Sequence, residues 1–123
     1  MISSALPTVY VKDIVAAVRF YTEILGCKLQ FQSGPYWAQV DAGRGTSIGL
    51  HPPSAKAPAP GTHGSISIGF YVNGSIDDTV ETLKAKGVRF HGPIVADPPV
   101  RLAFFSDPDG NDLYLCEYKP ESA

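Results

Sequence analysis

This chain has little cysteine, tryptophan or methionine, and neither sign of charge is in large excess. Its 123 residues include two cysteines, one tryptophan and one methionine, and the formal net charge at pH 7 is −2. Two cysteines without a CxxC spacing indicate buried thiols rather than a disulfide framework or a zinc site. A nearly balanced charge provides no basic surface for a nucleic-acid backbone. The sequence therefore predicts no nucleic-acid partner.

Long apolar runs are also absent. The longest are far shorter than a bilayer requires, so we expect no membrane segment. The first residues lack a charged region followed by an apolar core, which is the pattern of a secretory signal. Together with the cysteine usage, this predicts a cytoplasmic protein. The hydrophobic content of 44% is typical of a globular domain that buries a core.

The chain contains a pattern that occurs twice. Leu6–Leu29 and Ser67–Phe90 each begin with a β-branched apolar run, continue with helical apolar spacing and reach a glycine before a second strand-like run. Gly26 and Gly87 stand where a helix would end in a left-handed residue. A repeat in which the glycines also occupy equivalent positions predicts a duplicated structural unit.

Each copy is expected to fold as β-α-β-β-β within a single domain, with modules at about 5–51 and 65–118. The connector 52–64 is rich in proline and alanine and is expected to be extended. Pro7 cannot donate a ladder hydrogen bond, so the strand that contains it should lie at a sheet edge or at a point of exchange between chains. The expected strands span 6–12, 28–32, 36–41, 46–51, 65–72, 88–91, 101–106 and 112–117, and the expected helices follow Asp13 and cover 76–86.

Alternation along these strands separates an apolar face from a polar and aromatic one. The apolar set, expected under the helices, is Val9, Val11, Ile48, Leu50, Ile66, Ile68, Leu113 and Leu115. The opposite set is Thr8, Tyr10, Trp37, Gln39, Ser47, Gly49, His51, Ser65, Ser67, Gly69, Tyr71, Tyr114 and Cys116. Few charges and many Tyr, Trp, Ser and His side chains on one face indicate a small-molecule site, with plain sheet packing as the alternative.

Charged and histidine side chains give weaker signals. His51 ends a strand just before two prolines, so it is either a hydrogen-bond anchor or a solvent-facing residue. His63 and His91 fall in predicted loops and share no metal-ligand spacing. Arg101 is either a partner for a ligand carboxylate or an ordinary surface arginine. No nucleophile–base pattern is present, and we predict no catalytic residue.

Two segments carry a resemblance to a known family. VKDIVAAVRFYTEILG in the first copy and FFSDPDGNDLYLCE in the second resemble the vicinal oxygen chelate superfamily, which includes glyoxalase I, extradiol dioxygenases, and fosfomycin and bleomycin resistance proteins. The resemblance implies an α+β fold in which two βαβββ modules form curved mixed sheets around a cleft. It also implies a divalent metal bound at four inward positions in many members.

The residues at those four positions are Leu6, Gly49, Ser67 and Tyr114. Leucine and glycine offer no side-chain ligand, and a neutral serine or tyrosine is a poor one. We therefore predict no metal and no cofactor. The pattern is similar to the bleomycin-resistance branch, whose members bind a drug at a two-chain interface, and this implies a homodimer.

The sequence thus favours a metal-independent small-molecule binding protein, with antibiotic sequestration as one form of that function. The alternative is a glyoxalase-type lyase or isomerase, or a dioxygenase-like enzyme, with an atypical metal site. The expected ligand is small, planar and at least partly aromatic, because aromatic rings stack on one another. The predicted ligand-binding residues are Tyr10, Trp37, Gln39, Gly49, His51, Ser67, Tyr71, Arg101 and Tyr114.

Overall fold

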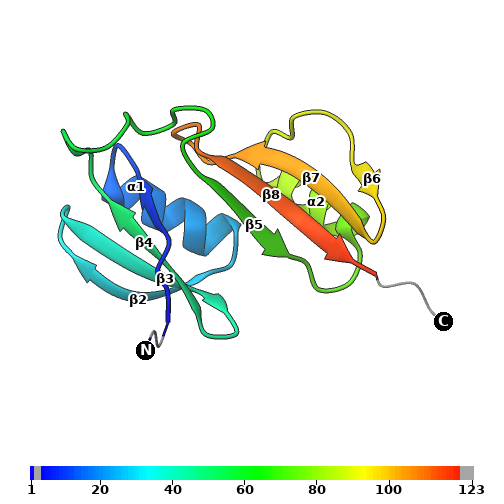
Figure 1. Cartoon of the computed structure of the whole chain (residues 1–123), viewed down its shortest axis with the longest axis horizontal. Coiled ribbons are helices and arrows are strands. Elements are labelled where there is room, and N and C mark those ends of the chain that lie inside the picture. The colour runs from blue at the N-terminus through cyan, green and yellow to red at the C-terminus, as the bar shows by residue number, and fades with distance from the viewer. Residues whose placement is uncertain (2–3, 120–123) are drawn as a thin grey trace. The chain divides into compact units, whose positions relative to one another are not determined.

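The computed structural model describes residue 1 and residues 4–119, and it divides into two compact units with a boundary after Thr62. In the first unit the elements are β1 (Thr8–Tyr10), α1 (Ile14–Arg19), the π-helix η1 (Phe20–Ile24), β2 (Lys28–Ser33), β3 (Trp37–Gly43) and β4 (Thr46–His51). In the second they are β5 (Ser67–Tyr71), α2 (Ile76–Ala85), β6 (Val95–Asp97), β7 (Val100–Ser106) and β8 (Asp112–Tyr118). The β-α-β-β-β order expected for each copy is confirmed (Figure 1).

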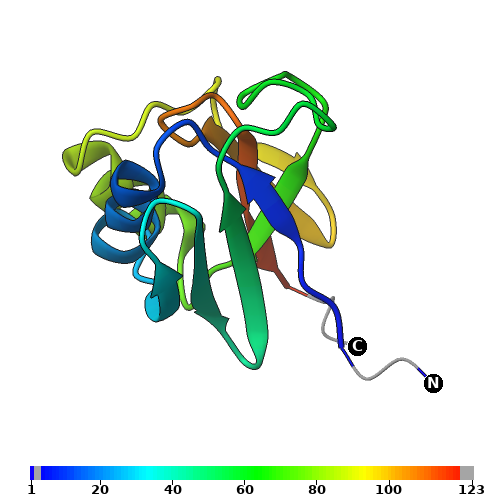
Figure 2. The same ribbon diagram turned by 90° about the vertical axis from the view of Figure 1, so that its left-hand side faces the viewer.

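The two units have the same sheet topology. The strand order is β1-β4-β3-β2 in the first and β5-β8-β7-β6 in the second. In each unit the first strand pairs with the last in parallel, and the remaining neighbours are antiparallel. Figure 2 shows β1, in blue, running beside β4. The mixed sheets predicted from the family resemblance are therefore present.

Pro7 lies just outside β1 rather than inside it, and β1 is an edge strand as expected. Its carbonyl still accepts a hydrogen bond from the backbone N–H of Gly49 at 2.8 Å. Because the N–H and C=O of a strand residue point to the same side, the N–H that Pro7 lacks would also face β4, and the strand begins only at Thr8.

The helix of the first unit departs from the expected uniform helix. α1 begins after Asp13, whose carboxylate accepts a hydrogen bond from the N–H of Ala16 at 3.2 Å, as an N-cap residue does. After Arg19 the helix widens into η1, and Gly26 ends the segment at φ 84°. The Thr22 hydroxyl donates to the carbonyl of Val18 at 2.6 Å within this segment.

One predicted strand is wrong. Residues 88–91 form no strand; Phe90 makes an isolated bridge to Phe105, and the N–H of His91 donates to the carbonyl of Phe104. Gly92 then turns the chain at φ 88°, and pairing resumes at Val95–Asp97 on the other end of β7. The edge strand of this sheet is therefore β6, which begins three residues after Gly92. The apolar pattern did not predict the turn at Gly92.

Each unit buries its own core. Val9, Val40, Ile48 and Leu50 in the first unit are at most 1% exposed beneath α1. Phe105 and Leu113 do the same in the second, where α2 packs on β7 and β8. Ile66 lies just before β5 and Ile68 lies within it, and both residues, which we expected in this core, are only partly buried. None of the helices in the described residues is long and apolar enough to cross a membrane.

Candidate functional site

The polar face of the first unit gathers five of the predicted ligand-binding residues. The ladder pairs Tyr10 with His51 and Gln39 with Gly49, so these side chains share one face of the sheet. The rings of Tyr10 and His51 lie 5.1 Å apart, and those of Trp37 and His51 lie 6.3 Å apart in an edge-on arrangement. His51 is therefore the centre of an aromatic cluster, which we call the Trp37 cluster: Tyr10, Trp37 and His51.

The hydrogen bond of His51 defines its tautomer. Its Nδ1 lies 2.6 Å from the carbonyl oxygen of Pro52. A carbonyl can only accept, so Nδ1 carries the hydrogen and donates it. In the neutral ring Nε2 is then the acceptor.

Gly49 serves a purpose other than the one expected. We expected it to leave room for a ligand, but a Cβ at this position would lie 2.3 Å from the ring carbon Cη2 of Trp37 and 3.1 Å from Oγ1 of Thr8. The indole therefore lies directly against the glycine backbone. The small residue is needed so that Trp37 can lie flat on the sheet.

Gln39 is held by a residue that the sequence did not point to. Its side-chain amide donates to Oε1 of Gln30 at 3.1 Å, and the hydroxyl of Ser47 donates to the same oxygen at 2.8 Å. Gln30 lies at a register shift in β2 between Leu29 and Phe31. The irregularity brings a side chain from the edge strand into the polar face.

The second unit presents a comparable face. Gly69 pairs with Tyr114, and a Cβ at Gly69 would lie 2.3–2.5 Å from atoms of the tyrosine ring. The ring centroids of Tyr114 and Phe104 are 5.9 Å apart. Tyr71 is 80% exposed on the edge strand. Tyr114, Phe104 and Tyr71 thus supply aromatic surface on β8, β7 and β5.

A pocket of about 590 Å³ lies in this second unit. Its walls include Phe104, and its polar lining comprises His63, Ser67, His91, Ser106 and Asp112. His91 Nε2 lies 2.7 Å from the hydroxyl of Ser106, and His63 Nδ1 lies 3.0 Å from Oδ2 of Asp112. Of the predicted residues only Ser67 belongs to this pocket. We call it the His63 pocket.

The backbone N–H of Gly64 donates to Oδ2 of Asp112 at 2.9 Å and is the main reason that the pKa of this carboxyl is lowered. The hydrogen bond from His63 lowers it further. An ionised Asp112 thus ties residues 63 and 64, at the end of the connector, to the start of β8. His63 was missed because its contact with Asp112 spans 49 positions in the sequence.

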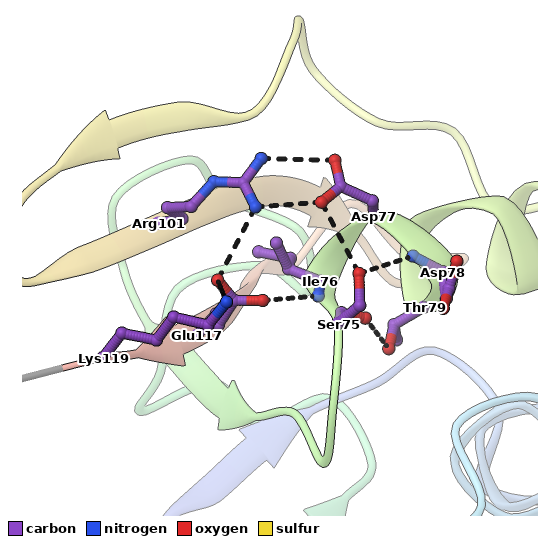
Figure 3. Close-up of polar contacts among 8 residues, drawn as sticks. All are labelled: Ser75, Ile76, Asp77, Asp78, Thr79, Arg101, Glu117 and Lys119. Carbon is purple, nitrogen blue, oxygen red and sulfur yellow. Dashed lines mark hydrogen bonds and ion pairs between the residues drawn. The ribbon is translucent and has the colours of Figure 1, made fainter.

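Arg101 lies on the other side of the sheet from Ser67 and Tyr114. It pairs with Glu117 across β7 and β8, on the side covered by α2 (Figure 3). Its guanidinium donates two hydrogen bonds to the carboxylate of Asp77, at 2.9 and 3.2 Å. The bond from Arg101 is the main cause that lowers the pKa of Asp77. Within the second unit, the structure therefore does not bring Arg101 together with Ser67 and Tyr114.

Glu117 completes this network, which we call the Glu117 network: Ser75, Asp77, Arg101, Glu117 and Lys119. Its side chain is 4% exposed, and Oε2 accepts a hydrogen bond from the N–H of Ile76 at 2.8 Å at the start of α2. That bond is the main cause that lowers its pKa. Oε1 has no hydrogen bond in the described chain but lies 3.6 Å from Arg101 and 3.7 Å from Lys119.

The residues at the family's metal positions do not form a metal centre. Gly49 is covered by an indole ring, and the ring of Tyr114 lies against Gly69. Among residues 1 and 4–119 there is no group of three or more His, Cys, Asp or Glu side chains that could hold a metal ion. A zinc, nickel or iron ion needs about three strong ligands. These positions do not suit one.

The comparisons with known proteins agree with this architecture. The family model described as "Glyoxalase/Bleomycin resistance protein/Dioxygenase superfamily" matches residues 4–115. The chain belongs to this superfamily and has its α+β fold, with two four-stranded mixed sheets. A comparison with curated proteins finds no match.

Solved structures refine the relationship. TnmS3, an antibiotic binding protein from Streptomyces sp. CB03234, is similar at 34% identity and a TM-score of 0.81, over 96% of this chain and 98% of that one. A superfamily member from Sphaerobacter thermophilus DSM 20745 has 30% identity and a TM-score of 0.77, over 95% and 98%. A lactoylglutathione lyase from Agrobacterium tumefaciens, at 19% identity, a TM-score of 0.76 and coverage of 94% and 92%, shares the fold.

Proposed function

We propose that this protein binds a small planar aromatic molecule without a metal and sequesters it, as an antibiotic-binding protein does. The observation that carries the proposal is the pair of aromatic faces built over Gly49 and Gly69, one in each unit. Neutral side chains accompany the first face, where Gln39 and Ser47 both donate to Gln30. Arg101 donates to Asp77 instead. Such surfaces favour stacking with an uncharged aromatic ligand.

The similarity to TnmS3 supports this reading over the enzymatic one. TnmS3 is an antibiotic binding protein and is 34% identical to this chain, whereas the lyase shares 19%. The chemistry of Leu6, Gly49, Ser67 and Tyr114 also disfavours a catalytic metal. Elemental analysis of the purified protein is the direct check. About one zinc, nickel, iron or manganese ion per chain that survives mild chelation would favour the glyoxalase-type alternative instead.

A binding assay based on Trp37 tests the proposal. Trp37 is the only tryptophan, so its emission reports on the Trp37 cluster. Planar aromatic antibiotics that raise the melting temperature should also quench or shift this emission. Trp37→Ala should weaken them roughly tenfold, which corresponds to the loss of about 1.4 kcal/mol of binding free energy.

Tyr36→Ala is the matched control for that assay. Tyr36 precedes β3 and is 73% exposed, so its removal deletes a neighbouring aromatic ring without touching the cluster. The control should bind like the unmodified chain. Tight binding that leaves Trp37 emission unchanged, and that survives Trp37→Ala, would contradict the proposal.

The proposal includes a homodimer in the cytoplasm. β2 is an edge strand whose residues are all exposed, and Leu29 and Phe31 on it are 46% and 58% exposed. Unpaired edges with apolar side chains favour association with a second copy. Cys27 and Cys116 are free thiols, as expected in a reducing compartment. Analytical ultracentrifugation at tens of micromolar should give twice the mass of one chain; a monomer would contradict this part.

A further inference from the structure

The His63 pocket has the size of a small-molecule site but was not expected to be one. Its volume of about 590 Å³ falls within the range of about 300–1,000 Å³ usual for such sites. Phe104, 39% exposed, offers an aromatic wall, and polar groups from three separate segments occupy the lining. Among residues 1 and 4–119, neither a lysine nor an arginine lines the pocket. The lining therefore suits an uncharged ligand that can form hydrogen bonds.

The Asp112 carboxylate determines what His63 can offer to such a ligand. An ionised carboxylate only accepts hydrogen bonds. The contacts of 3.0 and 3.2 Å from His63 Nδ1 to its two oxygens therefore require the imidazole hydrogen on Nδ1. In the neutral ring Nε2 then carries a lone pair. The side chain is 94% exposed, so ligand and solvent can both reach this lone pair.

His91 and Ser106 furnish a second polar point in the same pocket. Their 2.7 Å contact joins an imidazole nitrogen to a hydroxyl, which can turn to donate or to accept. Ser67 pairs with Asp112 in the β5–β8 ladder, so the Ser67 hydroxyl and the Asp112 carboxylate lie on the same face of the sheet. The negative charge of Asp112 disfavours an anionic ligand group at this end of the pocket.

We propose that the His63 pocket binds the hydroxylated edge of a planar aromatic ligand, with His63 Nε2 accepting the phenolic hydrogen and Phe104 contacting the ring. The proposal rests on the proposed function, because it names the chemical class of the ligand. It adds a specificity-determining residue that lies outside the Trp37 cluster. Ligands of the same shape but without the hydroxyl hydrogen should bind less well, because His63 then has no hydrogen bond to accept.

A pair of probes isolates that hydrogen. 7-Hydroxycoumarin and 7-methoxycoumarin have the same ring and the same oxygen atom, but only the first carries a phenolic hydrogen. In equilibrium dialysis of the full chain at pH 7, the hydroxy compound should bind about tenfold more tightly, the worth of one hydrogen bond of about 1.4 kcal/mol. In His63→Phe, which keeps an aromatic ring but removes the acceptor, the two probes should bind equally.

Tyr36→Phe is the control variant, and ¹⁵N NMR of the imidazole is an independent readout. The control removes the exposed hydroxyl of a residue that is not among those lining the pocket, and it should keep the tenfold preference. In the unmodified chain the neutral His63 ring should carry its hydrogen on Nδ1. A hydrogen on Nε2 would overturn the proposal whatever the probes do.

Equal binding of the two probes by the unmodified chain would also overturn it, and so would a preference that persists in His63→Phe. Failure of both coumarins to bind at millimolar concentration counts against it in the same way. These results differ from a failure of the proposed function, which is judged by planar antibiotics and Trp37 emission. A chain that binds those antibiotics but not the coumarins retains the function and loses this assignment.

Discussion

The two units of the chain repeat one topology and differ in where their polar groups are concentrated. Each unit has a parallel pair flanked by antiparallel strands, one helical segment and an aromatic ring laid over a strand glycine. In the first unit that ring is Trp37, from an antiparallel neighbour of Gly49; in the second it is Tyr114, from the parallel neighbour of Gly69. The same local solution is thus reached with different strands.

The helix starts differ more. At the start of α1, the exposed Asp13 caps the helix. At the start of α2, Ser75 caps the helix and the buried carboxylate of Glu117 also accepts a hydrogen bond from the N–H of Ile76. The second unit also holds Asp112 against Gly64. Apolar packing thus stabilises the repeated backbone in both units, and in the second unit the carboxylates of Glu117 and Asp112 also hold backbone N–H groups in place.

Acid should therefore affect the second unit most strongly, and this is the largest effect we predict. The pKa values of Asp77, Asp112 and Glu117 are lowered in the folded chain. A carboxyl whose pKa is lowered by folding stabilises the fold above its unfolded value, and that stabilisation is lost as the pH falls through the lowered value. Hydrogen exchange below pH 4 should show amides of α2 and β8 opening before those of β4. Earlier opening of β4 would contradict the comparison.

Removing one buried carboxylate should come next in size. Glu117→Ala leaves the N–H of Ile76 without its partner and removes the anion next to Arg101. We expect the melting temperature to fall by roughly 10–15 °C, because a buried donor left unpaired destabilises the fold. Glu117→Gln keeps an oxygen that can accept the hydrogen bond from Ile76, so its melting temperature should fall less than that of Glu117→Ala. Equal losses in the two variants would show that charge, and not the hydrogen bond to α2, is what matters.

Alanine at the two strand glycines compares the aromatic faces directly. Gly49 is buried and has both Trp37 and Thr8 above it, so Gly49→Ala should destabilise the chain by about 2–3 kcal/mol. Gly69 is exposed, so Tyr114 can move away, and Gly69→Ala should cost about 1 kcal/mol. Denaturant unfolding measures both. In a Trp37→Ala background the Gly49 substitution should lose most of its effect; an unchanged cost would refute the stacking explanation.

The helix caps should give the smallest difference. Asp13 and Ser75 each accept one backbone N–H, at 3.2 and 3.3 Å. Substitution of either by alanine should cost about 1 kcal/mol, the usual value for an N-cap. Denaturant midpoints with unchanged slopes would confirm that the two caps are equivalent. A clearly larger loss for Ser75→Ala would mean that the cap also orders the Glu117 network.

The sequence predicted well whatever depends on local periodicity. Period-two alternation located β4 at residues 46–51 and separated the faces that carry Tyr10, Trp37 and Tyr114. It could not reveal the register shift that brings Gln30 to Gln39, because Leu29 and Phe31 keep a regular two-residue spacing in the sequence across the shift. It also placed a strand at 88–91, where the β-branched and aromatic residues suit a strand but Gly92 ends the pairing.

The site was harder to predict because long-range contacts build it. His63 and His91 belong to loops, and only their hydrogen bonds to Asp112 and Ser106 give them a fixed place in a pocket. An arginine can bind a ligand carboxylate, but the guanidinium of Arg101 is paired with Asp77 on α2 and lies near Glu117 on β8. Which partner a charged side chain takes depends on tertiary packing, and no spacing rule contains that information.

The connector has a consequence for the insertions and deletions that the chain can tolerate. Every strand pairing found in the described residues closes within one unit, and Gly64 is fixed to Asp112, so neither sheet depends on the length of residues 52–62. The free energy of a flexible connection changes only slowly with its length. Insertions and deletions in this segment should therefore leave both cores intact, which makes it a suitable point for inserting a further sequence.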